Sequence, residues 1–158
     1  MQFTPGQLRE TVGISVETYR HWKRVLPPFA DRQGYVAGFS IGDLVAARVL
    51  RCLTETFGVR AGHLSELSVA IVRLCNASPW AKLIDRDVVI APEAQTCRMV
   101  GHGTESVRDK PIIICPMSPL MMELGSALKG LLPASEQQQF QFPPVEFSDV
   151  RRRAGRSS

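Results

Sequence analysis

The feature that most constrains the fold is a pair of short helical segments separated by a three-residue turn near the N-terminus. Thr4 is a helix cap and Pro5 fits the first helical position, which together predict a helix over residues 5–11. In the turn that follows, Gly13 can take a positive φ. Ser15 then caps a second helix. Two short helices joined by a glycine turn predict a helix-turn-helix.

The second helix of this pair is predicted to carry charge on one side and aromatic rings on the next. Arg20, Lys23 and Arg24 lie three and four residues apart and therefore share a side of the helix. Tyr19 and Trp22, three apart, cover the neighbouring side. A helix with this pattern can dock on a core through its aromatic rings and face a polyanion with its cations.

A series of short motifs follows one order along residues 4–59. The motifs are Thr4-Pro5-Gly6-Gln7-Leu8, Gly13-Ile14-Ser15, Thr18-Tyr19-Arg20-His21-Trp22, Pro27-Pro28, Gly34-Tyr35, Phe39-Ser40-Ile41-Gly42-Asp43-Leu44 and Gly58-Val59. The series resembles the MerR superfamily of winged-helix regulators, whose usual pattern opens T-I-G-E-L-A, G-V-S, T-I-R-Y-Y-E. The resemblance covers roughly the first half of the chain, which departs from the family in carrying Lys23 for an acidic residue and Val36 for the wing arginine.

The resemblance implies a recognition helix that enters the major groove of double-stranded DNA. Its first residues would contact bases or nearby backbone, its cations would contact phosphate or guanine edges, and the wing would meet flanking backbone or minor groove. Tyr19 belongs to this helix, although its spacing from Trp22 favours the core. The candidate DNA-binding residues are Ser15, Val16, Glu17, Thr18, Tyr19, Arg20, His21, Lys23, Arg24, Arg32 and Tyr35.

The charge distribution agrees with this expectation. The chain has 158 residues, a net charge of +4 and a pI of about 9.1. Residues 1–76 hold nine Lys/Arg against six Asp/Glu, whereas residues 77–132 hold six of each. The excess of positive charge therefore coincides with the predicted helix-turn-helix, as expected of a protein that reads DNA.

The remaining patterns predict an α+β fold. Helices are expected over residues 40–57 and 61–75, with short strands over 87–90, 96–100 and 111–115. Ser118 and Pro119 predict the start of one more helix. We therefore expect a winged helix-turn-helix domain at 1–76, a small β-rich module with one amphipathic helix at 80–132, and a disordered tail at 133–158. The tail ends in an arginine cluster that is either a solvated terminus or an additional DNA-binding arm.

A lone small sheet buries little area, so the second module is expected to pack on a partner. No long pairing helix follows Pro79, which leaves residues 80–132 to join two copies in a homodimer. The candidate dimerisation residues are Ile113, Leu120, Leu124 and Leu128. The same module could instead sense a small effector or bind a protein partner.

Other residues with possible chemistry are expected to be structural. The four cysteines, at 52, 75, 97 and 115, contain no Cys-x-x-Cys pair, so buried thiols are expected rather than a metal site. His102, between two glycines, has no partner at metal or catalytic spacing. Arg48 and Arg51 could touch phosphate or lie on a solvated helix face. No apolar run reaches the ~20 residues of a transmembrane helix.

The function predicted from the sequence is a dimeric, sequence-specific transcriptional regulator of bacterial or phage type. It would bind DNA without cofactor or metal and work in the cytoplasm, associated with the nucleoid. One alternative is a DNA-architectural protein of a mobile element, of the excisionase or small terminase subunit type. Another is an effector-sensing regulator that uses residues 80–132. An enzyme is not expected, because no nucleophile–base pair, paired carboxylates or phosphate loop stands out.

Overall fold

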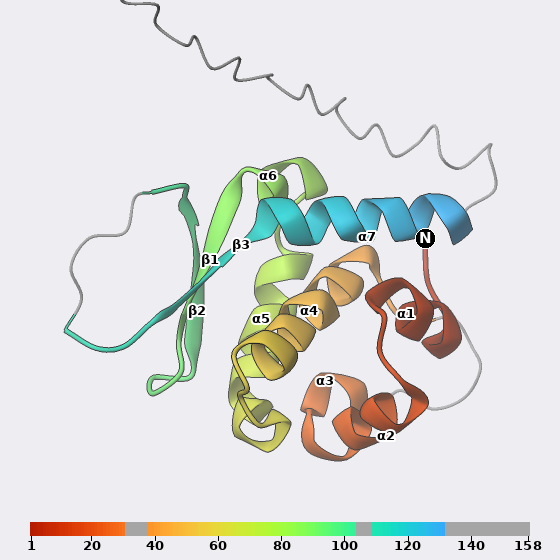
Figure 1. Cartoon of the computed structure of the whole chain (residues 1–158), viewed down its shortest axis with the longest axis horizontal. Coiled ribbons are helices and arrows are strands. Elements are labelled where there is room, and N and C mark those ends of the chain that lie inside the picture. The colour runs from red at the N-terminus through yellow and green to blue at the C-terminus, as the bar shows by residue number, and fades with distance from the viewer. Residues whose placement is uncertain (31–37, 104–108, 132–158) are drawn as a thin grey trace, which may run out of the picture.

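The structure, a computed structural model, describes residues 1–30, 38–103 and 109–131 (Figure 1). Short helices from the first half of the chain form one body, a long helix lies across it, and a small sheet stands at one side (Figure 1). The predicted α+β class is confirmed, and the strands form a three-stranded antiparallel sheet. The elements are α1 (Pro5–Val12), α2 (Val16–Val25), α3 (Pro27–Ala30), α4 (Ile41–Arg51), the π-helical turn η1 (Cys52–Thr56), the 3₁₀-helix η2 (Ala61–Leu64), α5 (Ser65–Asn76), α6 (Trp80–Ile84), β1 (Arg86–Ala91), β2 (Thr96–Gly101), β3 (Ile113–Pro116) and α7 (Met117–Leu131).

The predicted pair of N-terminal helices and its glycine turn are confirmed. Thr4 and Gln7 form a reciprocal capping box at the start of α1, with Thr4 Oγ1 accepting from the Gln7 amide at 3.2 Å. Gly13 ends α1 at φ +77° and donates its N–H to Arg9. Ser15 Oγ then accepts from the Thr18 amide at 3.0 Å and starts α2. The chain therefore turns sharply between α1 and α2.

An antiparallel bridge joins Phe3 to Phe39. The Phe3 amide donates to the Phe39 carbonyl at 2.8 Å, and the Gly38 amide donates to the Phe3 carbonyl at 3.0 Å. Residues 31–37 lie outside the described residues. The predicted wing residues Arg32 and Tyr35 belong to that segment.

Helices α4 and α5 approach each other closely at Gly42. A Cβ atom on Gly42 would lie 2.8 Å from Asn76 Cα, so only glycine fits there. The same crossing is bridged by polar side chains: Asn76 Nδ2 donates to Asp43 Oδ1 at 2.9 Å, and Ser40 Oγ donates to Asn76 Oδ1 at 2.6 Å. Ser40 also caps α4 in a capping box with Asp43. These contacts fix the end of α5 against the start of α4.

The three strands pair in the order β2-β1-β3, both pairs antiparallel, with Val88 opposite Met99 on one side and Cys115 on the other. All three predicted strands exist, with boundaries shifted by one or two residues. Helix α7 begins at Met117, so Ser118 and Pro119 lie in its first turn and do not cap it as predicted. The short helix α6 was not predicted, because five residues after Pro79 show no helical period.

One buried apolar cluster runs through both of the predicted modules. It joins residues of the N-terminal helices, such as Leu8 and Leu44, to Val88 of β1 and Leu124 and Leu128 of α7. Helix α7 packs against α1, α4 and α6, as its course across the helical body shows (Figure 1). The second module therefore shares its core with the first.

This packing corrects the residues that we predicted for dimerisation. Leu124 and Leu128 are 1% and 0% exposed within a single chain, so they have no area to offer a second copy. Ile113 and Leu120 are half-buried and pack against the same core. The apolar stripe of α7 was assigned to a partner because its spacing is visible in the sequence, whereas the surface that covers it, on α1 and α4, is not.

Candidate nucleic-acid interface

Helix α2 is anchored to the core by its aromatic side. Trp22 is 1% exposed and its ring lies 5.4 Å from that of Phe29. Tyr19 is 7% exposed and meets the rings of Phe29 and Phe39 edge-on at 6.5 and 6.4 Å. The inclusion of Tyr19 among the DNA-contacting residues was therefore wrong, because its ring is one of those that hold α2 to the core.

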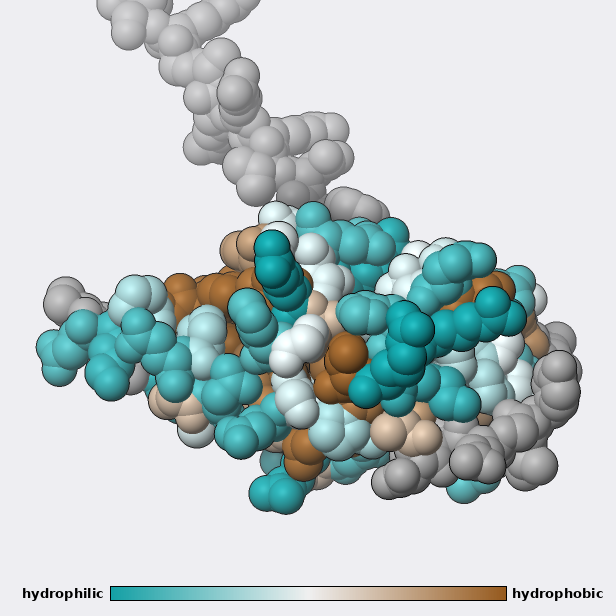
Figure 2. All heavy atoms as spheres, turned by 90° about the horizontal axis from the view of Figure 1, so that it is seen from below, coloured by the Kyte–Doolittle hydropathy of each residue, from teal (hydrophilic) through white to brown (hydrophobic). Residues whose placement is uncertain are grey.

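The opposite side of α2 is open to solvent. Ser15, Val16, Glu17, Arg20, His21 and Arg24 are exposed, and Thr18 and Lys23 are partly exposed. With three cations and one carboxylate, the helix carries a net charge of +2 if His21 is neutral. Figure 2 looks onto the face of the molecule at which α2 and α3 lie, and hydrophilic side chains predominate there, interrupted by isolated apolar ones.

The cations of α2 have no partners in the parts of the chain that the structure describes. No hydrogen bond or ion pair there engages the side chains of Arg20, Lys23 or Arg24. Ser15 and Thr18 differ, because the Ser15 hydroxyl accepts from the Thr18 amide and donates to Thr18 Oγ1 at 3.0 Å. Their hydroxyls therefore serve the helix cap first, and the three cations are the groups left available to bind an anion.

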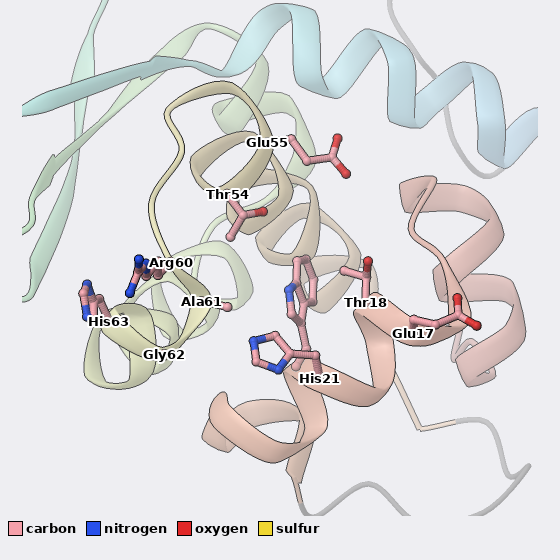
Figure 3. Close-up of a pocket in the computed structure, with 10 residues that line it drawn as sticks. Glu17, Thr18, His21, Thr54, Glu55, Arg60, Ala61, Gly62 and His63 are labelled. Carbon is pink, nitrogen blue, oxygen red and sulfur yellow. The ribbon is translucent and has the colours of Figure 1, made fainter.

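A hollow of about 650 Å³ lies beside α2, between this helix and the segment that contains η1 and η2 (Figure 3). His21 points across it toward Ala61 and Gly62, and Arg60 and His63 stand on the far side (Figure 3). The sequence did not single out Arg60 or His63, because only the tertiary fold returns them to α2. The hollow is lined by Glu17, Thr18, His21, Trp22, Thr54, Glu55, Arg60, Ala61, Gly62 and His63.

Arg48 and Arg51 are committed inside the molecule. Both donate to the carbonyl oxygen of Val12, Arg51 from Nη1 at 2.7 Å and Arg48 from Nη1 at 3.3 Å. Arg51 also pairs with Glu55 at 2.7 Å, and Arg48 pairs with Glu123 of α7. Burial, followed by the neighbouring charge of Arg51, lowers the pKa of Arg48. These guanidinium groups hold α1, α4 and α7 together. They therefore do not lie on a solvated helix face.

Away from α2, the structure gives His102 a partner that the sequence did not reveal. Its Nδ1 lies 2.6 Å from Oδ1 of Asp87, a residue 9% exposed on β1. This contact forms because pairing of β1 with β2 brings together residues that are 15 apart in sequence.

The four cysteines are free thiols. Cys75 and Cys115 are buried, whereas Cys52 and Cys97 are half-buried. Among the described residues, no group of three or more His, Cys, Asp or Glu is arranged to hold a metal ion. Within the same ranges, no helix has both the length and the apolar character needed to cross a membrane.

No protein-family model and no curated protein matches the chain.

Proposed function

We propose that the protein is a sequence-specific, double-stranded-DNA-binding transcriptional regulator. In this proposal α1 and α2 act as a winged helix-turn-helix similar to that of the MerR superfamily, with α2 in the major groove. One observation carries the proposal: the cations exposed on α2 have no partner in the described chain, whereas Arg48 and Arg51 do. A helix that is fixed by buried aromatic rings and presents unpaired cations is suited to a polyanion.

The exposed side of α2 offers groups for both kinds of DNA contact. Arg20, Lys23 and Arg24 would neutralise phosphates or reach guanine edges. Val16 can pack on a thymine methyl group, and Glu17 can accept a hydrogen bond from the amino group of cytosine. These two residues begin the helix, which is the end that contacts base edges in helix-turn-helix proteins.

The hollow beside α2 supports the same orientation. Arg60 and His63 stand opposite His21 across it (Figure 3). With α2 in the major groove, the adjacent phosphate backbone would run along this hollow, and Arg60 would lie beside it. The interface would then comprise α2 and the η2 segment.

Such a module reads only a few base pairs, so we propose that it acts as a homodimer on two half-sites. The two copies would be joined by surface other than Leu124 and Leu128. Ile114 of β3 and Met122 of α7, 41% and 38% exposed, are the large apolar side chains that residues 80–132 leave open among those described. The regulator would work in the cytoplasm on nucleoid DNA.

Selection of duplexes from a random pool by the full chain tests this function. We expect an enriched motif with two related half-sites whose centres are about 34 Å apart, or a multiple of that distance. Genomic footprints that overlap promoter elements would support regulation, whereas footprints confined to attachment or packaging sites would favour the architectural class. Failure to enrich any duplex at low salt would refute the proposal.

A further inference from the structure

Each side of the hollow beside α2 carries a histidine. His21 comes from the middle of α2 and points across the hollow, while His63 of η2 stands with Arg60 on the opposite side (Figure 3). Helix α2 packs against η2, and both histidines are exposed to solvent. Within the described residues, no hydrogen bond or ion pair engages either imidazole ring. The two rings are therefore available to a ligand that enters the hollow.

The charges that line the hollow balance when both histidines are neutral. Glu55 pairs with Arg51 at 2.7 Å, so its carboxylate is already compensated. Glu17 and Arg60 contribute one negative and one positive charge. The hydroxyl of Thr54 donates to main-chain carbonyl groups of its own helical segment and is not available to a ligand. A lining that has no net charge attracts phosphate only weakly, so the state of the two histidines decides its affinity for an anion.

The charged groups nearest to the two histidines are also balanced. Each histidine has one carboxylate and one cation three or four residues away, a spacing at which side chains of a helix are neighbours. These groups are Glu17 and Arg24 around His21, and Glu66 and Arg60 around His63. From η1, Glu55 faces the hollow as well, and Arg51 neutralises it. A phosphate group would therefore bring the largest unbalanced charge to either ring.

We propose that His21 and His63 bind DNA phosphates in their protonated form, which makes the hollow a phosphate site whose affinity depends on pH. The inference rests on the function proposed above, in which the DNA backbone runs along this hollow. Histidine is the side chain whose charge ordinarily changes between about pH 5 and 8. A protonated ring donates from both of its nitrogen atoms. Two protonated rings would raise the net charge of the lining, with Arg51 included, from zero to +2.

Protonation and DNA binding should then assist each other. A phosphate stabilises the charged ring, and by linkage each proton taken up on binding raises the affinity by up to about tenfold for each pH unit that the pH falls. Affinity should therefore decline as the pH rises through the range in which histidine loses its charge. Arg20, Lys23 and Arg24 of α2 keep their charge throughout this range. They would hold DNA at every pH, and the histidines would adjust the strength of binding.

Binding of the full-length protein to a duplex selected from a random pool, measured from about pH 5.5 to about pH 8 at fixed salt, tests the site. We expect the wild type to bind about 10 to 100 times more tightly at the lower pH, which is roughly threefold to tenfold for each histidine. The slope of log Kd against log salt should be steeper there by about 1–2, because each protonated ring neutralises one more phosphate.

Three variants assign this pH dependence. His21→Gln and His63→Gln should each lose about half of the logarithmic change in affinity, and the double variant should bind with the same affinity at both ends of the range. His102→Gln is the matched control, because it removes the third histidine of the chain, which contacts Asp87 of the sheet. It should behave like the wild type. Circular dichroism at each pH checks that the variants remain folded.

Calorimetry of the wild type in two buffers of different ionisation enthalpy counts the protons taken up without any substitution. We expect about one proton per bound chain near neutral pH. Four results would overturn the proposal: no proton uptake, an affinity that does not change with pH, an affinity that rises with pH, and a pH dependence that survives in the double variant. Failure to bind the duplex at any pH would refute the proposed function itself, and this site with it.

Discussion

Arg51 donates a hydrogen bond from Nη1 to the carbonyl oxygen of Val12 at 2.7 Å, across 39 residues of sequence. Val12 is the last residue of α1, so the guanidinium group satisfies a carbonyl that the helix end leaves open. Gly13 lies directly beneath it, and a Cβ atom there would be 2.4 Å from the same Nη1. The turn that sets α2 against α1 is thus held by α4.

Replacing Arg51 with methionine tests this anchor. Arg51→Met keeps most of the aliphatic volume but removes the donor to Val12, so we expect a loss of about 1–2 kcal/mol in unfolding free energy. Arg73→Met, on the exposed surface of α5, is the control and should change stability by no more than about 0.5 kcal/mol. Denaturant titration measures both, and equal effects would show that the Arg51 contact does not stabilise the turn.

Two glycine substitutions, one at the crossing of α4 and α5 and one in α7, should have opposite effects on stability. Gly42→Ala would place a Cβ 2.8 Å from the Asn76 backbone, which should cost about 1–3 kcal/mol. Gly130→Ala, in α7, meets nothing within 4 Å and should gain about 0.5–1 kcal/mol from helix propensity. Thermal melting of the two variants distinguishes them, and a neutral Gly42→Ala would mean that the helices are not this close.

A charge introduced at Leu124 should unfold both predicted modules and not only the second. Leu124 is 1% exposed in the cluster that also contains Leu8 and Leu44, so Leu124→Glu should cost about 3–5 kcal/mol for the whole chain. Circular dichroism and proteolysis should show that residues 1–76 lose protection together with residues 80–131. If residues 1–76 stay folded in this variant while the rest unfolds, the two modules are independent and do not share one core.

Stability should fall at alkaline pH because buried thiols resist ionisation. Burial raises the pKa of Cys75 from the ordinary value of 9.0 to about 12. The folded state then holds a proton that the unfolded state releases above pH 9, so the contribution is complete below that pH and is lost as pH rises toward 12. Denaturation under reducing conditions at pH 8–11 should show a flatter decline for Cys75→Ala than for wild type, and identical slopes would contradict this assignment.

The parts of the fold that sequence could predict are those set by local chemistry. Thr4 and Ser15 each cap a helix where expected, and Gly13 takes the positive φ that the turn requires. The strands were found because their β-rich runs are bounded by turn residues. Local signals of this kind depend on neighbours a few residues away, and the sequence displays those neighbours directly.

What sequence could not predict depends on which surfaces meet. The stripe of α7 looked like a dimer seam because nothing local shows that α1 and α4 cover it. Likewise, the sequence left Arg51 as a possible phosphate contact, whereas in the fold its side chain binds the Val12 carbonyl. The contact of His102 with Asp87 depends on the pairing of β1 with β2, which the sequence does not display. In the candidate site, the exposed residues of α2 were predictable from helical spacing, whereas Arg60 and His63 required the tertiary return of η2.

The salt dependence of binding to a selected duplex tests the central claim most directly. Wild type should show log Kd rising with log salt, and the triple variant Arg20→Gln, Lys23→Gln, Arg24→Gln should lose about 0.9 of slope for each phosphate contact removed. The control Arg73→Gln, Lys82→Gln, Arg86→Gln removes the same charge from exposed positions on α5, α6 and β1 and should keep the wild-type slope. We predict a slope lowered by about 2–3 in the α2 variant alone; equal slopes in all three proteins would contradict DNA binding through α2.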